Sequence, residues 1–137
     1  MDFSVYYRNK IIDHMLRGQS FTVPTTVYVA LFTADTGLSA NSPTGEVSLS
    51  GTAYERLAVT LSEASAGDSA NSAILEWDPA TADWGTITHA AIVDHATNTN
   101  WGTGVNVLMW DALVAPKSIN TDDIFRIPAG NLEIEIR

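Results

Sequence analysis

The chain has 137 residues, no cysteine, and sixteen acidic against seven basic side chains, which gives a formal net charge of −9 at pH 7. This length suits one domain with a sizeable core, and the lack of thiols excludes disulfides, thiolate metal sites and cysteine nucleophiles. Affinity for nucleic acid comes from clustered Lys and Arg, so we expect no nucleic-acid partner.

The N-terminal segment, residues 1–18, predicts one amphipathic helix. Apolar side chains recur at three- and four-residue spacing over residues 3–17, with Asp2 or Ser4 available as the N-cap and Gly18 to end the helix. We interpret this helix either as an element that closes one end or one face of a β-sandwich or as an arm that docks on a neighbouring subunit. Charged residues occur throughout it, so we expect neither a secretory signal nor a membrane partner, and a soluble product of the cytoplasm.

The next two segments differ sharply in composition. Residues 26–33 form a continuous apolar run, which is typical of a strand buried on both faces. Residues 34–52 are rich in Gly, Ser, Asn, Thr and Pro and show no strong periodicity. A loop of this length is either a mobile, solvated connection or a binding and assembly element, and composition does not separate the two.

The remainder of the chain alternates strand-like runs with Gly, Pro and Asn turns. Residues 86–93, entered through Gly85, are expected at the centre of a sheet because both faces are apolar from Ala90 onward. Further strands are expected at residues 54–61, 72–77, 105–114, 124–127 and 132–136, with a loop at 63–71 and a break at Pro116.

Seven or eight short strands behind one helix predict a mainly β fold. We expect a single domain over residues 1–137, an antiparallel β-sandwich of jelly-roll type with one N-terminal α-helix. An immunoglobulin-like sandwich is the alternative.

Chemistry-bearing residues do not form a recognisable catalytic or metal-binding pattern. The three histidines, His14, His89 and His95, lack the spacing that directs two ligands at one ion, and no serine lies in a nucleophile elbow. A glycosidase needs only two carboxyls that meet in space, but the spacing selects no such pair. We therefore expect no enzyme activity, no metal and no cofactor.

The four tryptophans divide into two groups. Trp77, Trp84 and Trp110 adjoin or lie in apolar runs and are expected in the core. Trp101 stands alone in a loop of Asn, Thr and Gly over residues 94–104, and is the best candidate among them for a contact surface.

Six short segments, spread in order over nearly the whole chain, carry a resemblance to a known family. They are NKIIDH at residues 9–14, VYVALFT at 27–33, YER at 54–56, ATADWGTITH at 80–89, ALVAPK at 112–117 and AGNL at 129–132. Together they resemble small virion proteins of tailed bacteriophages, which are described either as head decoration (cement) proteins or, loosely, as tail-fibre proteins.

The resemblance implies a structural role in the virion and brings no catalytic residue with it. It implies first a capsid decoration protein on the outer surface of the shell, with the major capsid protein and copies of itself (a homo-oligomer) as partners. The alternative is a tail-fibre or tail-tip module that binds a host-surface receptor or glycan, with Trp101 in its groove. A β-sandwich enzyme or lectin unrelated to virions is the third interpretation.

For the decoration role we expect the helix, the 34–52 loop and the Trp101 loop to provide the contacts. The candidate contact residues are Arg8, Leu38, Val47, Leu49 and Trp101. Deleting residues 36–50 is then expected to abolish attachment to the shell and to leave the fold intact.

Overall fold

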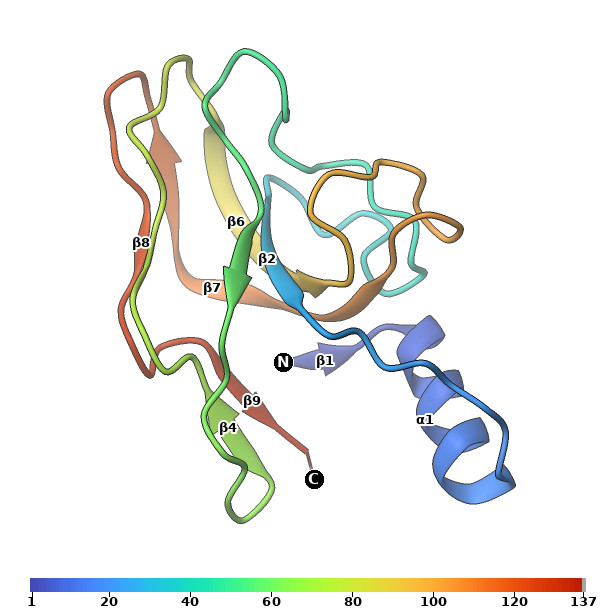
Figure 1. Ribbon diagram of the computed structural model, residues 1–137. Coiled ribbons are helices and arrows are strands. Elements are labelled where there is room, and N and C mark those ends of the chain that lie inside the picture. The colour runs from blue at the N-terminus through green and yellow to red at the C-terminus, as the bar shows by residue number, and fades with distance from the viewer. Residues whose placement is uncertain (137) are drawn as a thin grey trace.

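The structure, a computed structural model, describes residues 1–136 and is mainly β (Figure 1). The helix is α1 (Val5–Arg17). The strands are β1 (Asp2–Phe3), β2 (Val27–Phe32), β3 (Leu57–Val59), β4 (Asp68–Ala70), β5 (Leu75–Glu76), β6 (Gly85–Val93), β7 (Val107–Ile119), β8 (Arg126–Ile127) and β9 (Glu133–Glu135). This arrangement confirms the predicted antiparallel β-sandwich with one N-terminal helix.

The main sheet has the strand order β1-β7-β6-β2-β3, and all of its pairs are antiparallel. β2 and β6 lie in its interior, as their apolar character on both faces predicts. Successive residues of β2 point to opposite faces, so Val29 and Leu31 join one hydrophobic cluster while Ala30 and Phe32 join another.

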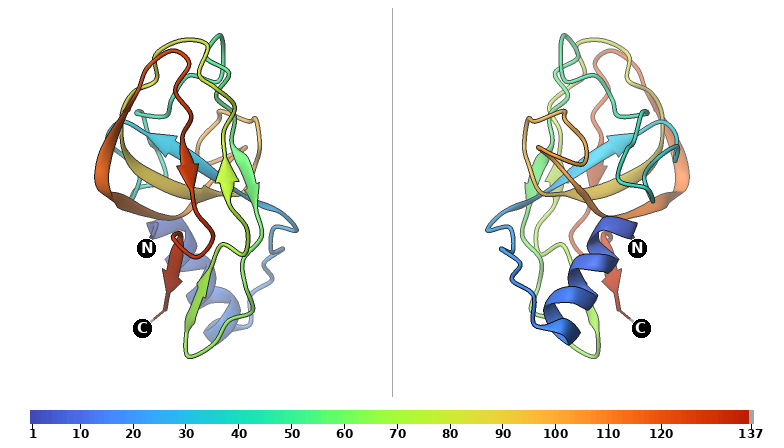
Figure 2. Two further views of the ribbon diagram at one scale, coloured as in Figure 1. Left: turned by 90° about the vertical axis from the view of Figure 1, so that its left-hand side faces the viewer. Right: turned by 90° about the vertical axis from the view of Figure 1, so that its right-hand side faces the viewer.

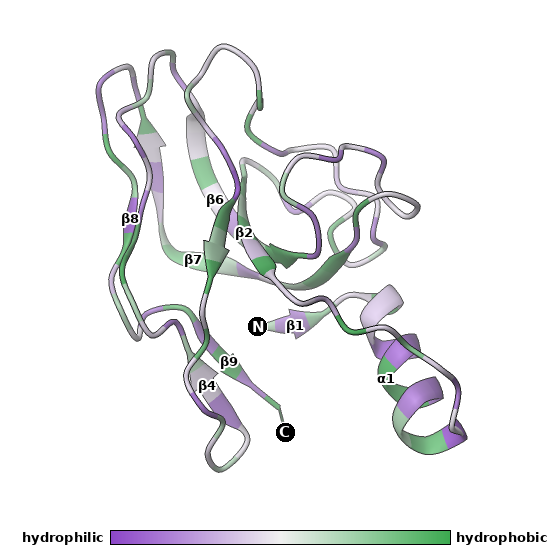
Figure 3. Cartoon of the chain, in the orientation of Figure 1, coloured by the Kyte–Doolittle hydropathy of each residue, from purple (hydrophilic) through white to green (hydrophobic). Residues whose placement is uncertain are grey.

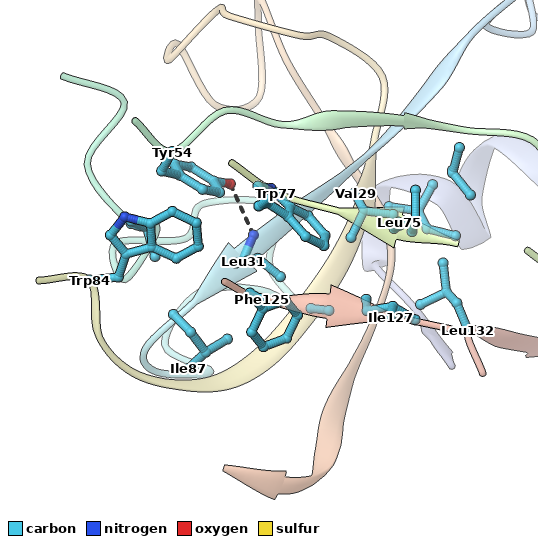
Figure 4. Packing of buried hydrophobic residues seen from close by; sticks show 14 of the residues in the cluster. Val29, Leu31, Tyr54, Leu75, Trp77, Trp84, Ile87, Phe125, Ile127 and Leu132 are labelled. Carbon is cyan, nitrogen blue, oxygen red and sulfur yellow. Dashed lines mark hydrogen bonds between the residues drawn. The ribbon is translucent and has the colours of Figure 1, made fainter. Parts of the chain in front are cut away.

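Two short ribbons, β4–β9 and β5–β8, form the second layer of the sandwich. Leu75 and Ile127 are paired across the β5–β8 ribbon and belong to the same cluster as Val29 of the main sheet (Figure 4). Trp77 lies beside them, packs edge-on against Phe125 with ring centroids 5.3 Å apart, and is 1% exposed. The larger core therefore lies between the main sheet and the ribbons.

The 34–52 loop is ordered and packs against the body of the protein. Leu38 is fully buried in the cluster on the far side of the main sheet, and the Val47 amide donates to the Leu31 carbonyl at 3.1 Å. Gly37 has a positive φ of 79°, and a side chain there would collide with the Ser42 carbonyl. The structure argues against the prediction that the fold survives deletion of residues 36–50, because the deletion removes core residues.

Several strand boundaries differ from the sequence prediction, most clearly at β4 and β7. The expected 63–71 loop contains β4, which pairs with β9 in spite of its small, polar residues. β7 continues through Pro116, where a break was expected. Residues 113–116 bulge out between the register pairs Ile87–Lys117 and His89–Ala112, so Pro116 removes no ladder hydrogen bond.

The helix ends where the sequence predicts, but it begins at Val5 rather than at residue 3, because Phe3 belongs to β1. The Ser4 hydroxyl accepts from the Tyr7 amide at 3.1 Å, and Gly18 ends α1 in the left-handed conformation. No residue of α1 is fully buried, and both views in Figure 2 show the helix projecting below the main sheet. Tyr6 and Tyr7 pack against the larger hydrophobic cluster, so α1 lies against one end of the sandwich rather than over a face of it. Within residues 1–136, no helix has the length and apolarity needed to cross a bilayer.

Candidate functional site

Arg56 joins three separate parts of the chain in one buried cluster. Its side chain is fully buried, and its Nε and Nη2 donate to the two carboxylate oxygens of Glu46 at 2.7 and 2.8 Å. Its Nη1 donates to the carbonyls of His95 and Asn98 at 2.9 and 2.8 Å. This pairing offsets the desolvation of the guanidinium and ties the 34–52 loop to the loop that contains Trp101.

Trp101 belongs to this cluster rather than to an open groove. The Arg56 guanidinium carbon lies 5.0 Å from the centroid of the indole ring, and the Phe32 ring centroid is 6.2 Å away. A cation–π contact and an aromatic contact within the chain therefore engage the ring on which a sugar would stack. Trp101 is half-buried, so its predicted role in contacts between proteins stays a prediction.

Tyr54 extends the cluster into the larger core (Figure 4). Its hydroxyl accepts from the Leu31 amide at 3.0 Å and donates to Glu46 at 3.0 Å. Burial raises the pKa of the Tyr54 hydroxyl well above its ordinary value, and the nearby negative charge of Glu46 raises this pKa further. The phenol therefore stays protonated at neutral pH and serves as a structural hydrogen-bond donor.

The predicted contact residues occupy very different environments. Leu38 is fully buried and Val47 is 5% exposed, so the prediction that they touch a partner is wrong: both side chains are already used in the core. Leu49 is half-buried and packs against the larger cluster. Arg8 is exposed on α1, and contacts with a partner through Arg8 and Leu49 stay predictions.

The three histidines lie apart and each meets a local partner. These partners are the Gln19 carbonyl for His14, the Thr88 hydroxyl for His89, and the amides of Thr97 and Asn98 for His95. In the described part of the chain, no group of three or more His, Asp or Glu side chains is placed to hold a metal ion.

Two of the three expected core tryptophans are buried. Trp77 donates to the Glu55 carbonyl at 2.7 Å, and Trp84 donates to the Thr52 carbonyl at 2.9 Å. Trp110 is only half-buried, and its indole nitrogen finds no hydrogen-bond partner among residues 1–136. Its ring packs against His89, with centroids 6.1 Å apart, on the outer face of the main sheet.

Several exposed apolar side chains lie close together on α1. Ile12, Met15 and Leu16 are 50%, 70% and 80% exposed. The opposite side of the helix faces the returning chain, where Phe21 contacts the rings of Tyr7 and His14. Figure 3 shows hydrophobic and hydrophilic residues mixed along α1. Helical periodicity predicts an apolar face of α1, but it does not say whether that face lies against the rest of the chain or in solvent. The signal available in the sequence was Phe21, three residues after Gly18, whose ring covers the side of the helix that carries Tyr7 and His14.

A hollow of about 670 Å³ separates the start of α1 from the end of β9. Arg8 of the helix, Asp2 of β1 and Glu135 of β9 are among the residues that line it. Figure 1 shows α1 and the β4–β9 ribbon as two projections from the same end of the molecule, on either side of this space. This end combines exposed apolar and charged side chains, and we take it as the candidate contact site.

The sequence of this chain was compared with protein families and with curated proteins. No match was found among curated proteins. The model of the family described as podophage GP4 fiber I protein gp80 matches residues 2–135, which is nearly the whole chain. The chain therefore belongs to the podophage GP4 fiber I protein gp80 family, and it is a bacteriophage virion structural protein.

Proposed function

We propose that this protein is a non-catalytic structural subunit of a phage tail fibre. The observation that carries the proposal is the match to a fiber protein family over residues 2–135. The body of the molecule is compatible with this role: its polar residues at Glu46, Tyr54 and Arg56 bind one another, as a structural cluster does. In this proposal the partners are other virion proteins of the tail.

Within the fibre, we assign this protein an assembly role rather than glycan binding through Trp101. The Trp101 ring is engaged by Arg56 and Phe32, which weakens the sugar-groove interpretation. The exposed side chains Ile12, Met15 and Leu16 on α1 are instead suited to contact with another protein.

The resemblance seen in the sequence favoured capsid decoration, and the family description favours the fibre instead. Copy number and location distinguish the two roles. We expect quantitative mass spectrometry of purified particles to give far fewer copies of this protein than of the major capsid protein, and gold-labelled antibody to mark the tail. Label over the whole head, with a copy number close to that of the major capsid protein, would overturn the fibre proposal in favour of decoration.

A further inference from the structure

A second apolar surface lies between residues 111–117 of β7 and strand β8, on the side of the molecule away from α1 (Figure 1). The two strands belong to different sheets, and a hollow of about 380 Å³ lies between them; we call it the β7–β8 groove. Ala90, Leu113 and Ile127 line its apolar floor, and Val114 is fully exposed at its rim. The edge of the larger core therefore reaches the surface in this groove.

Both walls of the groove are strand edges whose outward backbone groups pair with no other strand in the described chain. β1 covers the edge of β7 only as far as Trp110. The next residue that faces this edge is Ala112, whose amide bonds to the carboxylate of Asp111 at 2.8 Å. On β8, the Phe125 carbonyl bonds toward the β5 side, so the backbone groups of Arg126 face away from β5. An extended chain in the groove meets backbone hydrogen-bonding groups on both sides.

The β7–β8 groove has opposite charges at its two ends. Lys117 lies at the end of β7 that is remote from β1. Glu133 begins β9, which Figures 1 and 2 both show close to the N-terminus. Neither side chain takes part in an ion pair within residues 1–136, whereas the other two charged groups of the rim, Asp111 and Arg126, each have a partner in the chain. These two charges give the groove a direction.

We propose that the β7–β8 groove binds an extended segment of a different virion protein. The segment has apolar side chains at its centre, an acidic residue beside Lys117 and a basic residue beside Glu133. A second copy of this chain fits poorly. Its β7 has to lie edge to edge with this one, where Pro116 has no amide to donate and residues 113–116 bulge out of the strand.

This inference goes beyond the proposed function, because it names a binding surface other than the exposed side chains of α1. Its tests use the purified full chain and whole particles. They do not depend on whether the protein lies in the tail or on the head, so each of the two proposals can fail without the other.

A synthetic peptide, Glu-Thr-Val-Thr-Val-Thr-Lys with both ends blocked, serves as the probe. Its alternation puts the two valines and both charges on one face, and its order suits a strand antiparallel to β7, as β1 is. Titration of the isotope-labelled full chain is followed by heteronuclear NMR. We expect the amide signals of residues 111–117 and 125–133 to move, with a Kd on the order of 1 mM, and those of residues 34–52 to stay in place.

Charge reversal tests the direction of binding. Lys117→Glu and Glu133→Lys are each expected to raise the peptide Kd by about threefold or more. The variant that carries both changes is expected to prefer the peptide in which Glu and Lys are exchanged. Asp35→Lys is the matched control: Asp35 is exposed in the 34–52 loop, and the same change of charge there is expected to alter the Kd by less than about twofold.

A steric block tests the location of binding. Ala115 is exposed and lines the groove, so Ala115→Trp is expected to abolish binding, and circular dichroism checks that each variant is folded. Three results would overturn the proposal. They are unmoved signals of residues 111–117 at about 10 mM peptide, equal affinity of the wild type for both peptides, and signals of residues 111–117 that move when the protein alone is concentrated, which would make a second copy the occupant.

Cross-linking of purified particles tests the partner in its own setting. A carbodiimide joins a lysine to a carboxylate in direct contact with it, and mass spectrometry identifies the joined peptides. We expect Lys117 to be linked to an acidic residue of a different virion protein. A link from Lys117 to a second copy of this chain would contradict the proposal.

Discussion

The Arg56 cluster and helix α1 use similar residue types in opposite ways. In the cluster, the Arg56 side chain is fully buried and meets the carboxylate of Glu46 and two backbone carbonyls. On α1, Arg8 is exposed, and Ile12 and Leu16 extend into solvent next to it. In the Arg56 cluster, the polar and apolar groups hold loops of one chain together. On α1, the same kinds of group stay available to another molecule.

This difference separates stability from assembly within one small domain. Substitutions in the body are expected to change the free energy of unfolding, because its side chains are buried and paired. Substitutions on the outer face of α1 are expected to change association and to leave the fold nearly unaffected. The four predictions below run from the largest expected effect on folding to the smallest.

Deletion of residues 36–50 is expected to prevent folding. It removes the buried side chains of Leu38 and Val47 and the carboxylate of Glu46, on which Arg56 depends. Circular dichroism and heteronuclear NMR of the deletion variant check this outcome. A variant with native-like, dispersed NMR signals would show that the 34–52 loop is not part of the folded body.

Glu46→Ala is expected to lower the free energy of unfolding by about 3–5 kcal/mol, because it leaves the buried Arg56 guanidinium without its counter-ion. The Glu76–Arg126 pair is a matched control, with side chains 46% and 54% exposed. Glu76→Ala is expected to cost about 0–1 kcal/mol. Urea denaturation of the three proteins measures both values, and equal losses for the two variants would contradict the structural role given to the cluster.

Tyr54→Phe is expected to cost about 1–3 kcal/mol, because the buried Leu31 amide loses its acceptor and Glu46 loses a donor. It is also expected to change the pH dependence. An unfolded tyrosine ionises near pH 10, whereas the raised pKa of Tyr54 keeps the folded state protonated, so wild-type stability falls as pH rises above about 10.

The Tyr54→Phe variant has no hydroxyl to ionise, so its stability lacks this pH dependence. The difference in unfolding free energy between wild type and Tyr54→Phe is therefore expected to narrow between pH 9 and pH 11, measured by urea denaturation at each pH. A difference that stays constant over this range would show that the Tyr54 pKa is not raised by folding.

Leu16→Ser is expected to change the free energy of unfolding of the monomer by no more than about 0.5 kcal/mol, since Leu16 is 80% exposed. Thermal unfolding of the purified protein at low concentration measures this value. A loss of several kcal/mol would mean that the outer stripe of α1 supports the fold, and the separation between stability and assembly would not hold.

The regular parts of this fold could be predicted from the sequence. The apolar runs that became β2 and the second half of β6 require cover on both faces, and Ser4 and Gly18 are the residue types that cap a helix. The long loop was misjudged because Leu38 and Val47 are isolated apolar residues without period, and only tertiary contact reveals that they are buried.

The candidate site was harder to predict for a different reason. Helical periodicity identifies an apolar face of α1, but it does not say whether that face lies against the same chain or outside it. Similarly, the separation of ten residues between Glu46 and Arg56 has no signature of its own, so the role of Trp101 beside Arg56 became visible only in the fold.

Hydrogen exchange measured by mass spectrometry on the free protein and on the same protein in purified phage tails tests the division of the molecule most directly. If the end that carries α1 and the β4–β9 ribbon is the assembly surface, peptides from α1, from residues 62–70 and from residues 133–136 gain protection in the tail, and peptides from residues 34–52 do not. Gains confined to residues 34–52 or to the Trp101 loop would contradict the account and return the contact surface to the body of the sandwich.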